Sequence, residues 1–554
     1  MILLKGQGVS RGVVKGPLCF YRRQEREDIQ KSGKTPEEEK ARLMRAQQEA
    51  IGQLHELAER CRGDMREAAD VFEAHAMLAE DEDFISHTHA LIDSERCSAE
   101  YAVRQAEKRF SGMLSELDDP YMQARAADIR DIADRIIGNL MNVREQKMDF
   151  TEPVVLAADD FTPSETVRLD PKMILGFITG RGSASSHTAI LARTMGIPAV
   201  CGLGEALREE YEGRTIYVDG EAGYAFMEPD AQMLADFEDR QQKQQEGRRM
   251  LESMKGMENI TPDGRKILIY CNIASPADVR AVLENDGEGI GLFRSEFLYL
   301  ASEDYPDEEA QFCVYRDVAA AMGGRRVIIR TLDIGADKQA GYFGIRPEEN
   351  PALGMRGIRI SLSRPDVFRT QLRALYRASA YGKIAIMFPM IASVWEVREC
   401  RSACRKTMAE LEREGIDFDR NVEIGVMIET PASVLIADDL AKEVDFFSVG
   451  TNDLTQYTLA CDRQAGDLGR FFDPHHPALL RSIAMAADAA HEAGIWIGVC
   501  GELAADRRLL SAFLEAGIDE LSVAPADVLP LRMEIRRNAG GQQSKINNHF
   551  RKGL

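Results

Sequence analysis

Apolar runs recur at regular intervals in the second half of the chain. Eight of these runs, most of them rich in Ile and Val, alternate with stretches of helical periodicity. The runs are Ile267–Ile273, Gly289–Phe293, Arg326–Leu332, Ile384–Pro389, Glu423–Ile428, Phe446–Val449, Ile495–Val499 and Glu520–Val523. Strands that alternate with helices form parallel sheets, and eight such strands predict a closed (β/α)₈, or TIM, barrel. An open doubly wound sheet is the alternative that the spacing leaves open.

A second set of strands brackets a long helical stretch in the first part of the chain. Residues 1–20 alternate apolar and polar positions around three glycines and predict two short strands. Later strands are predicted at Val154–Ala157, Met173–Ile178 and Thr215–Gly220. Between the two groups, helical periodicity begins at Thr35-Pro36, a cap followed by a first-turn proline, and continues to about Val143. We therefore expect an all-α insert within a small α/β domain.

These patterns predict a multidomain α/β protein with three folded parts and a connecting helix. Residues 231–255 are polar with little apolar face, which is typical of a helix that spans solvent between domains. The predicted parts are an α/β domain formed by residues 1–20 and 146–230, a helical subdomain at 21–145, a linker helix at 231–258, the barrel at 259–540 and a polar tail at 541–554.

Polar and ionisable side chains follow five of the predicted barrel strands. In such barrels the active site lies at the C-terminal ends of the strands, so these side chains should converge on one rim. They are Arg294, Glu296, Arg330, Asp333, Glu429, Asn452, Asp453, Cys500 and Glu502. Any one of them could belong to a structural ion pair, and their common position is what favours a functional site.

The types of side chain on this rim indicate the chemistry of the ligand. Arg294 and Arg330 offer planar forks suited to phosphate or carboxylate oxygens. Glu429 and Asp453 are hard oxygen ligands of the kind that Mg²⁺ prefers. We therefore expect a small, anionic, phosphorylated substrate held with Mg²⁺. Cys500 is either a plain buried thiol or a proton donor to a carbanion-like carbon, and spacing does not decide between the two.

A glycine- and serine-rich loop precedes His187. The segment from Gly180 to Arg193 follows a predicted strand and opens a helix that Ser185 or Ser186 can cap. A helix N-terminus binds anions, and a neutral imidazole is a competent nucleophile near neutral pH. The loop therefore predicts a cradle for a phosphorylated histidine, or else a capping loop whose histidine only forms hydrogen bonds.

Composition narrows the class of partner. The chain carries 69 basic and 91 acidic residues, a formal charge of −22, which argues against nucleic acid or an anionic membrane surface. Ten cysteines are scattered without paired spacing and read as reduced thiols. The first residues lack the layout of a signal peptide, and the sequence has no apolar run long enough to span a membrane. We expect a cytoplasmic protein without membrane insertion.

Two long motifs resemble the signatures of phosphoenolpyruvate-utilising enzymes. The segment Gly182–Arg193 resembles the phosphohistidine signature, and residues 446–463 (FFSVGTNDLTQYTLACDR) resemble the second signature almost without gaps. The resemblance extends over essentially the whole chain, helical insert included, to the Enzyme I family of the sugar phosphotransferase system. One departure is that many relatives carry Gly-Gly-Arg-Thr-Ser-His where this chain has Arg-Gly-Ser-Ala-Ser-Ser-His.

The resemblance implies a role for each site residue. His187 would accept the phosphoryl group of phosphoenolpyruvate and pass it to the carrier protein HPr, which would dock on the helical insert. Cys500 would protonate the enolate carbon of the product. The remaining implied roles are substrate binding by Arg294, Arg330, Arg463, Asn452 and Asp453, Mg²⁺ binding by Glu429 and Asp453, and further basic contacts by Lys338 and Arg356. The family also implies a homodimer formed through the barrel.

Three alternative functions lie within and outside the family. An ATP-dependent dikinase needs a nucleotide-binding domain ahead of the histidine domain, but mostly helical residues and no glycine-rich phosphate loop precede it here. A catalytically silent phosphocarrier would not need the rim residues. A phosphotransferase that serves a regulatory carrier instead of sugar uptake remains open.

Overall fold

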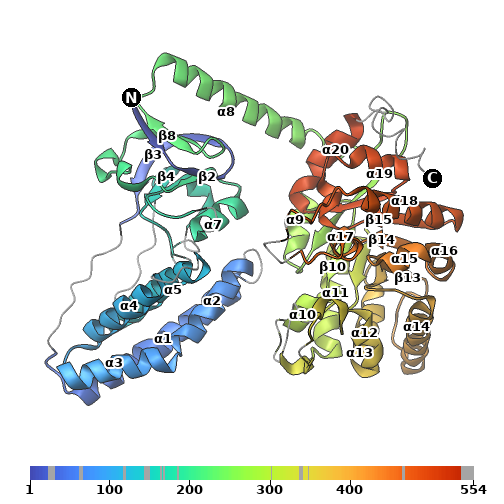
Figure 1. Cartoon of the computed structure of the whole chain (residues 1–554), viewed down its shortest axis with the longest axis horizontal. Coiled ribbons are helices and arrows are strands. Elements are labelled where there is room, and N and C mark those ends of the chain that lie inside the picture. The colour runs from blue at the N-terminus through green and yellow to red at the C-terminus, as the bar shows by residue number, and fades with distance from the viewer. Residues whose placement is uncertain are drawn as a thin grey trace. The chain divides into compact units, whose positions relative to one another are not determined.

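The computed structural model describes most of the chain, and the chain forms two compact units, Met1–Arg248 and Arg249–Leu554 (Figure 1). The described residues are 1–22, 32–61, 66–115, 120–141, 150–162, 165, 169–183, 186–300, 302, 304–335, 341–346, 348–463, 468 and 470–537, without the side chains of 59–61, 66–70, 115, 120–127, 171, 187 and 194. Of the predicted parts, the polar tail therefore lies outside the described residues.

An eight-stranded mixed sheet forms the α/β part of the first unit. Its order is β1-β8-β7-β3-β4-β5-β6-β2, with β3 to β6 parallel in the centre and antiparallel pairs at both edges. The strands are β1 (Ile2–Lys5), β2 (Gln7–Ser10), β3 (Val13–Phe20), β4 (Val154–Ala158), β5 (Ile174–Thr179), β6 (Ala199–Cys201), β7 (Thr215–Asp219) and β8 (Tyr224–Met227). Residues 1–20 thus form three strands where two were predicted. One break falls at Gly12, whose φ of +117° is open to glycine and strained for other residues.

Within the described residues, five helices lie between β3 and β4 and share a core of their own, which includes Leu54, Phe72 and Ile136. They are α1 (Pro36–Cys61), α2 (Arg66–Ala79), α3 (Glu82–Glu95), α4 (Ala99–Ser115) and α5 (Pro120–Leu140). The predicted helix start is confirmed. Thr35 N donates to a Glu38 side-chain oxygen at 2.8 Å, and Glu38 N donates to Thr35 Oγ1 at 3.3 Å, so each residue satisfies a backbone donor of the other.

A single long helix, α8 (Ala231–Glu252), follows the last strand of the first unit and leads into the second (Figure 1). More of this helix is packed against the sheet than its polar composition predicts. Phe237 is buried against Tyr217 and Phe226 of the sheet, and the Gln244 side chain accepts a hydrogen bond of 2.8 Å from Val13 N. The first two-thirds of the helix therefore belong to the α/β part.

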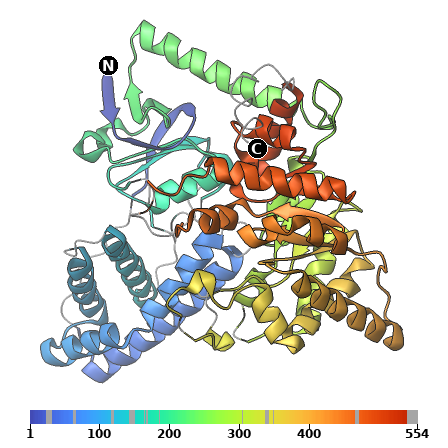
Figure 2. The same cartoon turned by 45° about the vertical axis from the view of Figure 1, so that its right-hand side comes forward.

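The second unit is a closed barrel of eight parallel strands, as predicted (Figure 2). The strands are β9 (Leu268–Ile273), β10 (Ile290–Arg294), β11 (Val327–Arg330), β12 (Ile384–Phe388), β13 (Glu423–Ile428), β14 (Phe446–Val449), β15 (Trp496–Val499) and β16 (Glu520–Val523). The pairing of β16 with β9 closes the barrel and rules out the open sheet. The helices are α9 (Asp278–Glu284), α10 (Glu296–Leu300), α11 (Glu308–Ala321), α12 (Ile358–Ser363), α13 (Pro365–Ser379), α14 (Val394–Glu414), α15 (Pro431–Leu435), α16 (Ala437–Leu440), α17 (Thr451–Leu459), α18 (Pro477–Glu492), α19 (Leu510–Ala516) and α20 (Val528–Arg537).

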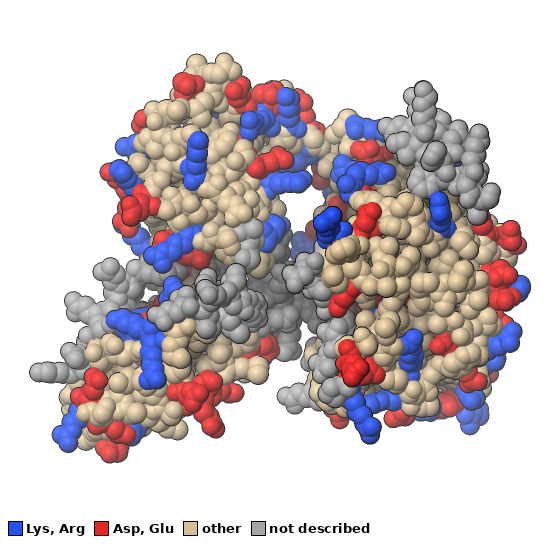
Figure 3. Space-filling model, in the orientation of Figure 1, with Lys and Arg blue, Asp and Glu red and all other residues tan. Residues whose placement is uncertain are grey.

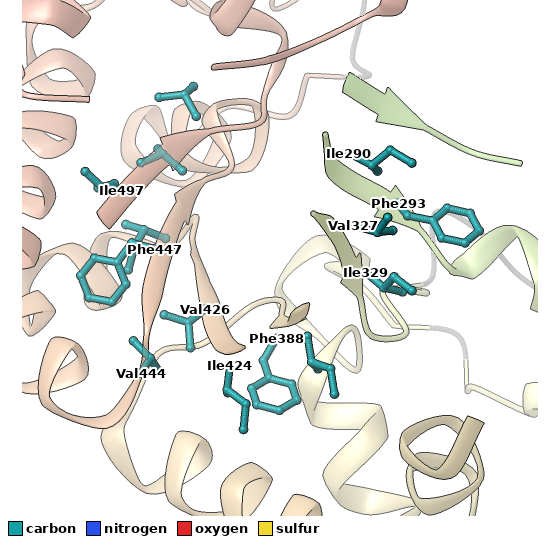
Figure 4. Packing of buried hydrophobic residues seen from close by; sticks show 14 of the residues in the cluster. Ile290, Phe293, Val327, Ile329, Phe388, Ile424, Val426, Val444, Phe447 and Ile497 are labelled. Carbon is teal, nitrogen blue, oxygen red and sulfur yellow. The ribbon is translucent and has the colours of Figure 1, made fainter. Parts of the chain in front are cut away.

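Side chains alternate along each barrel strand between the lumen and the surrounding helices. Ile329, Val426 and Ile497 point outward into the main core (Figure 4). Leu292 and Met427 belong to a separate cluster inside the lumen. This alternation follows from the two-residue period of a strand and fixes which residues can face a pocket at the end of the barrel.

The visible surface carries charges of both signs, with acidic and basic side chains interspersed over each unit (Figure 3). Such a mixed surface is typical of a protein kept in solution by its charge. Within the described part of the chain, no helix is long and apolar enough to cross a membrane.

Candidate active site

A pocket of about 560 Å³ opens at the C-terminal end of the barrel strands. Nearly all the predicted rim residues line it, although they come from five strands that are far apart in sequence. The predicted residues in its wall are Arg294, Arg330, Asp333, Arg356, Glu429, Asn452, Asp453, Arg463, Cys500 and Glu502. Glu296 lies behind this wall, and Lys338 lies outside the described residues.

Arg330 and Arg294 both line the pocket, but their guanidinium groups differ in the contacts they form. Arg330 is buried, and its guanidinium contacts Glu296 at 2.6 Å and Asp333 at 2.8 Å. The guanidinium of Arg294, by contrast, forms no hydrogen bond or ion pair with any part of the chain that the structure describes. An unpaired guanidinium in a pocket is a ready site for an anionic group, and the held one adds fixed positive charge beside it.

Asp453 stands between two further arginines. Its Oδ1 lies 3.3 Å from Arg356 Nη1, and its Oδ2 lies 3.8 Å from Arg463 Nη1. Arg356 also donates to the Tyr457 hydroxyl at 3.0 Å. The wall of the pocket therefore holds four guanidinium groups, and it also holds four carboxyl groups, so charges of both signs face the pocket.

Glu429 is a buried carboxylate with one oxygen unsatisfied. Its Oε1 accepts a hydrogen bond of 2.5 Å from Met390 N, while Oε2 has no hydrogen-bond partner in the described structure. Burial, with repulsion from Asp453 and Asp333, raises the pKa of Glu429 to about 8. A cation at Oε2 would relieve both the repulsion and the missing contact, so the pair Glu429 and Asp453 fits Mg²⁺.

Asn452 ties the start of α17 to the segment after β15. Its Nδ2 donates to Glu502 Oε1 at 3.0 Å, and its Oδ1 accepts from Glu502 N at 3.1 Å. These paired bonds fix the amide at the pocket edge. Asn452 is therefore held in one orientation before any ligand arrives.

Cys500 lies at the base of the pocket and is 2% exposed. Its Sγ lies 3.7 Å from the carbonyl oxygen of Val449. Burial raises the pKa of Cys500 to about 12, so the side chain is a thiol at neutral pH. A thiol can give up a proton, whereas a thiolate could only attack or bind metal.

Several lining residues were not predicted. Thr451 and Thr455 lie within the second signature and could have been found there by their spacing. Phe472 and Pro474 come from the loop after α17, which carries no periodic pattern, so no local signal pointed to them. They add apolar atoms to the wall of the pocket.

The predicted histidine begins helix α7 (His187–Met195) at the C-terminal end of β5. Ser186 caps the helix, and its Oγ accepts a hydrogen bond of 3.3 Å from Ala189 N. Gly182 adopts a φ of +97°, a turn that favours glycine in the loop. The side chain of His187 and residues 184 and 185 lie outside the described residues, but the backbone confirms the expected position at a helix N-terminus.

A bound phosphorylated group needs guanidinium donors and a cation. One pocket brings four arginines together with carboxyl groups that could bind the cation, so the fold and the site define the class of a phosphotransferase. Three family descriptions match the chain: PEP-utilising enzyme, PEP-binding domain, over residues 248–539; PEP-utilising enzyme, N-terminal, over 5–125; and PEP-utilising enzyme, mobile domain, over 150–223.

Curated relatives match over nearly their whole length. Phosphoenolpyruvate-protein phosphotransferase of Priestia megaterium is 39% identical over 536 residues, which are 96% of this chain and 94% of the relative. The protein of the same name from Bacillus subtilis (strain 168) is 37% identical over 540 residues, again 96% and 94%. A solution NMR structure of an Enzyme I protein is 33% identical, with a TM-score of 0.36, over 44% of this chain and 99% of that chain. The chain belongs to the phosphoenolpyruvate-protein phosphotransferases of the phosphoenolpyruvate-utilising enzyme family.

Proposed function

We propose that the chain transfers the phosphoryl group of phosphoenolpyruvate to His187 and then to a histidine of the phosphocarrier HPr, with release of pyruvate, as the first step of sugar uptake by the phosphotransferase system. The observation that carries this proposal is the gathering of Arg294, Arg330, Glu429, Asp453 and Cys500 in one pocket. Relatives named for this activity match 96% of the chain.

The arginines would bind the substrate. Arg294, Arg330 and Arg463 are proposed to hold the phosphoryl oxygens, with Asn452 and the Asp453 backbone at the remaining polar atoms of the substrate. Positioning and charge neutralisation supply most of the catalysis in phosphoryl transfer. Arg330 is already fixed by its two carboxylates and need not be ordered when the substrate binds.

Glu429 and Asp453 are proposed to hold Mg²⁺. When bound, the ion would neutralise negative charge on the substrate oxygens. Asp453 Oδ1 also contacts Arg356, so one carboxyl group would serve both the metal and this arginine.

Cys500 is proposed to protonate the enolate. Loss of the phosphoryl group from phosphoenolpyruvate leaves the enolate of pyruvate, whose C3 carbon must gain a proton. The Cys500 thiol lies at the base of the pocket in its protonated form, so the S–H bond breaks as the C3–H bond forms.

His187 is proposed to carry the phosphoryl group between the two partners. It belongs to the first unit and the pocket to the second, so the two units have to meet for the transfer and part again for HPr to reach the histidine. Negative charge on the phosphorylated imidazole would lie at the N-terminus of α7, where the helix dipole favours it. We also propose that HPr docks on the helical insert, that the chain forms a homodimer through its barrel, and that it acts in the cytoplasm.

The test is phosphorylation of the full-length chain by labelled phosphoenolpyruvate with Mg²⁺, followed by addition of HPr, with and without ATP. We expect an acid-labile, base-stable phosphoprotein that passes its label to HPr and needs no ATP. His187→Ala should abolish labelling, while His55→Ala, at an exposed histidine of α1, should not. Labelling that survives His187→Ala would refute the assigned acceptor.

A second experiment tests the proton donor. Cys500→Ala should abolish pyruvate formation with little change in substrate binding, because the thiol is at the reacting carbon and not at the phosphoryl group. A variant that makes pyruvate at the wild-type rate would return Cys500 to the class of plain buried thiols.

A further inference from the structure

Glu520 is a fully buried carboxyl group that the proposed reaction leaves unused. It opens β16 and is 0% exposed. Two glycines of other strands make room for it inside the barrel. A Cβ at Gly498 of β15 would lie 2.0 Å from Glu520 Oε2, and a Cβ at Gly291 of β10 would lie 2.9 Å from Glu520 Oε1. The carboxyl group therefore occupies the lumen and not the helix-facing side of its strand.

The same glycine places this carboxyl group directly below Cys500. Gly498 and Cys500 are two residues apart, so their side-chain positions lie on the same face of β15, about 6.6 Å apart along the strand. That face is the lumen, because Cys500 and Trp496 belong to the lumen cluster while Ile497 and Val499 belong to the outer core. Glu520 thus fills the position one step below the thiol.

Ser522 is a lumen-facing neighbour of both the carboxyl group and the thiol. Its hydroxyl donates a hydrogen bond of 2.5 Å to Glu520 Oε1. The strand register pairs Gly498 with Glu520 and continues in step, so the next residue on the same face, Ser522, is level with Cys500. The amide of Asn272 confirms this proximity, since its Nδ2 donates to the carbonyl oxygens of both Cys500 and Ser522, at 3.1 and 3.2 Å.

The proposed reaction creates a need for a proton at this place. When the Cys500 thiol protonates the enolate, a buried thiolate remains under the newly formed pyruvate. As long as pyruvate covers it, the pocket side of the sulfur is closed to water, and the thiolate can take the methyl proton back. Only the lumen side, where Ser522 and Glu520 lie, is open to a new proton.

We propose that Glu520 and Ser522 form a proton relay that reprotonates Cys500 from below and so commits the enzyme to releasing pyruvate. The inference rests on the proposed function, in which Cys500 is the proton donor. The Ser522 hydroxyl turns from Glu520 toward the thiolate, gives it its hydrogen and takes the proton of the Glu520 carboxyl group, which becomes a carboxylate. After pyruvate leaves, a solvent proton returns along the same three groups, so each turnover consumes one proton.

The charge state of Glu520 suits this role. Burial raises the pKa of Glu520 to about 8. The hydrogen bond with Ser522 and the charge of Arg326 lower this pKa, but their effect is smaller than that of burial. The group is therefore protonated at neutral pH and has a proton to give. Its other oxygen, Oε2, lacks a hydrogen-bond partner among the described residues, so that oxygen is not held in a fixed contact.

Two rates of the full-length enzyme separate a relay from a packing role. The first is net pyruvate production from phosphoenolpyruvate with Mg²⁺ and excess HPr. The second is exchange of labelled pyruvate into phosphoenolpyruvate without a carrier, in which one proton moves back and forth between Cys500 and the methyl carbon and none is supplied. Glu520→Gln keeps the volume of the side chain and removes the acid. We expect net production to fall at least about tenfold, with exchange within about twofold of wild type.

Ser522→Ala should give the same split, because it interrupts the relay and leaves the acid in place. Glu423→Gln is the matched control, since Glu423 also opens a barrel strand, β13, but is paired with Arg326 at 2.7 Å; both rates should persist. An equal fall of both rates in the Glu520 and Ser522 variants would assign them to packing, and an unchanged net rate would refute the relay. If Cys500→Ala retains both rates, Cys500 is not the proton donor. That outcome would refute the proposed function, and it is distinct from the outcomes that refute the relay.

Discussion

A buried histidine in the helical insert gives a pH dependence whose size follows from the structure. His75 of α2 is 0% exposed and lies between two carboxylates of α5, 3.1 Å from Asp128 and 3.4 Å from Asp131. Burial alone would lower the pKa of His75, but the two aspartates outweigh it and raise the pKa to about 9 from the ordinary 6.5. Folding therefore favours the charged imidazolium.

The sign and magnitude follow by linkage. Because the folded pKa lies above the unfolded one, the stabilisation is present in full below about pH 6.5 and is lost as the pH rises through about 9. A pKa difference of this size corresponds to about 3 kcal/mol. The histidine is fully buried, so solvent screening does not reduce this figure appreciably.

Hydrogen exchange of α2 and α5 in the full-length chain measures the effect, with rates corrected for the intrinsic pH dependence of exchange. The free energy of local opening should fall by about 3 kcal/mol between pH 6 and pH 9.5. His75→Gln should lower the opening free energy at pH 6 and remove its pH dependence. His55→Gln is the control, because that histidine is exposed on α1. A change below about 1 kcal/mol in wild type, or the same fall in His75→Gln, would refute the reasoning.

Three further predictions concern the barrel, whose unfolding can be followed alone because both tryptophans of the chain, at 395 and 496, lie in it. Arg294→Met should raise the KM for phosphoenolpyruvate at least about tenfold and change the free energy of unfolding by less than about 0.5 kcal/mol. Arg330→Met leaves two buried carboxylates without their partner, so it should lower the free energy of unfolding in urea by about 3–5 kcal/mol. Glu429→Gln should move the midpoint of Mg²⁺ activation to higher concentration by about tenfold or more, and an unchanged titration would count against the metal site. Gly498→Ala places a methyl group 2.0 Å from a buried carboxyl oxygen and should destabilise the barrel by roughly 1–3 kcal/mol by the same measurement.

The barrel and its rim were predictable because their signals are local. A strand buried on both faces is a continuous apolar run, and the first polar residue after it, such as Arg294 or Glu429, marks the end that faces the active site. The chain needs no long-range information to reveal these positions. The rule that all strand ends meet at one rim then supplied the convergence that the pocket displays.

The first unit was less predictable for the opposite reason. The three-residue strand β6 is too short to show a period, and its place in the sheet comes from pairing with β5 and β2. Likewise, the polar helix α8 gave no sign that Phe237 would be buried against the sheet. Loop residues such as Phe472 reach the pocket only through tertiary structure, which no periodicity encodes.

Glu520 shows the same limit inside a correctly predicted strand. A glutamate at the start of a strand is expected at the solvent-exposed end, and only closure of the barrel, with glycine at positions 291 and 498, turns it into the lumen. Burying this acid has a cost, since the protein must hold it protonated. Glutamine would fill the same volume, could keep the hydrogen bond to Ser522 and would need no proton. Packing alone therefore favours glutamine at this position, and the difference between net turnover and exchange in Glu520→Gln measures what the acid contributes instead.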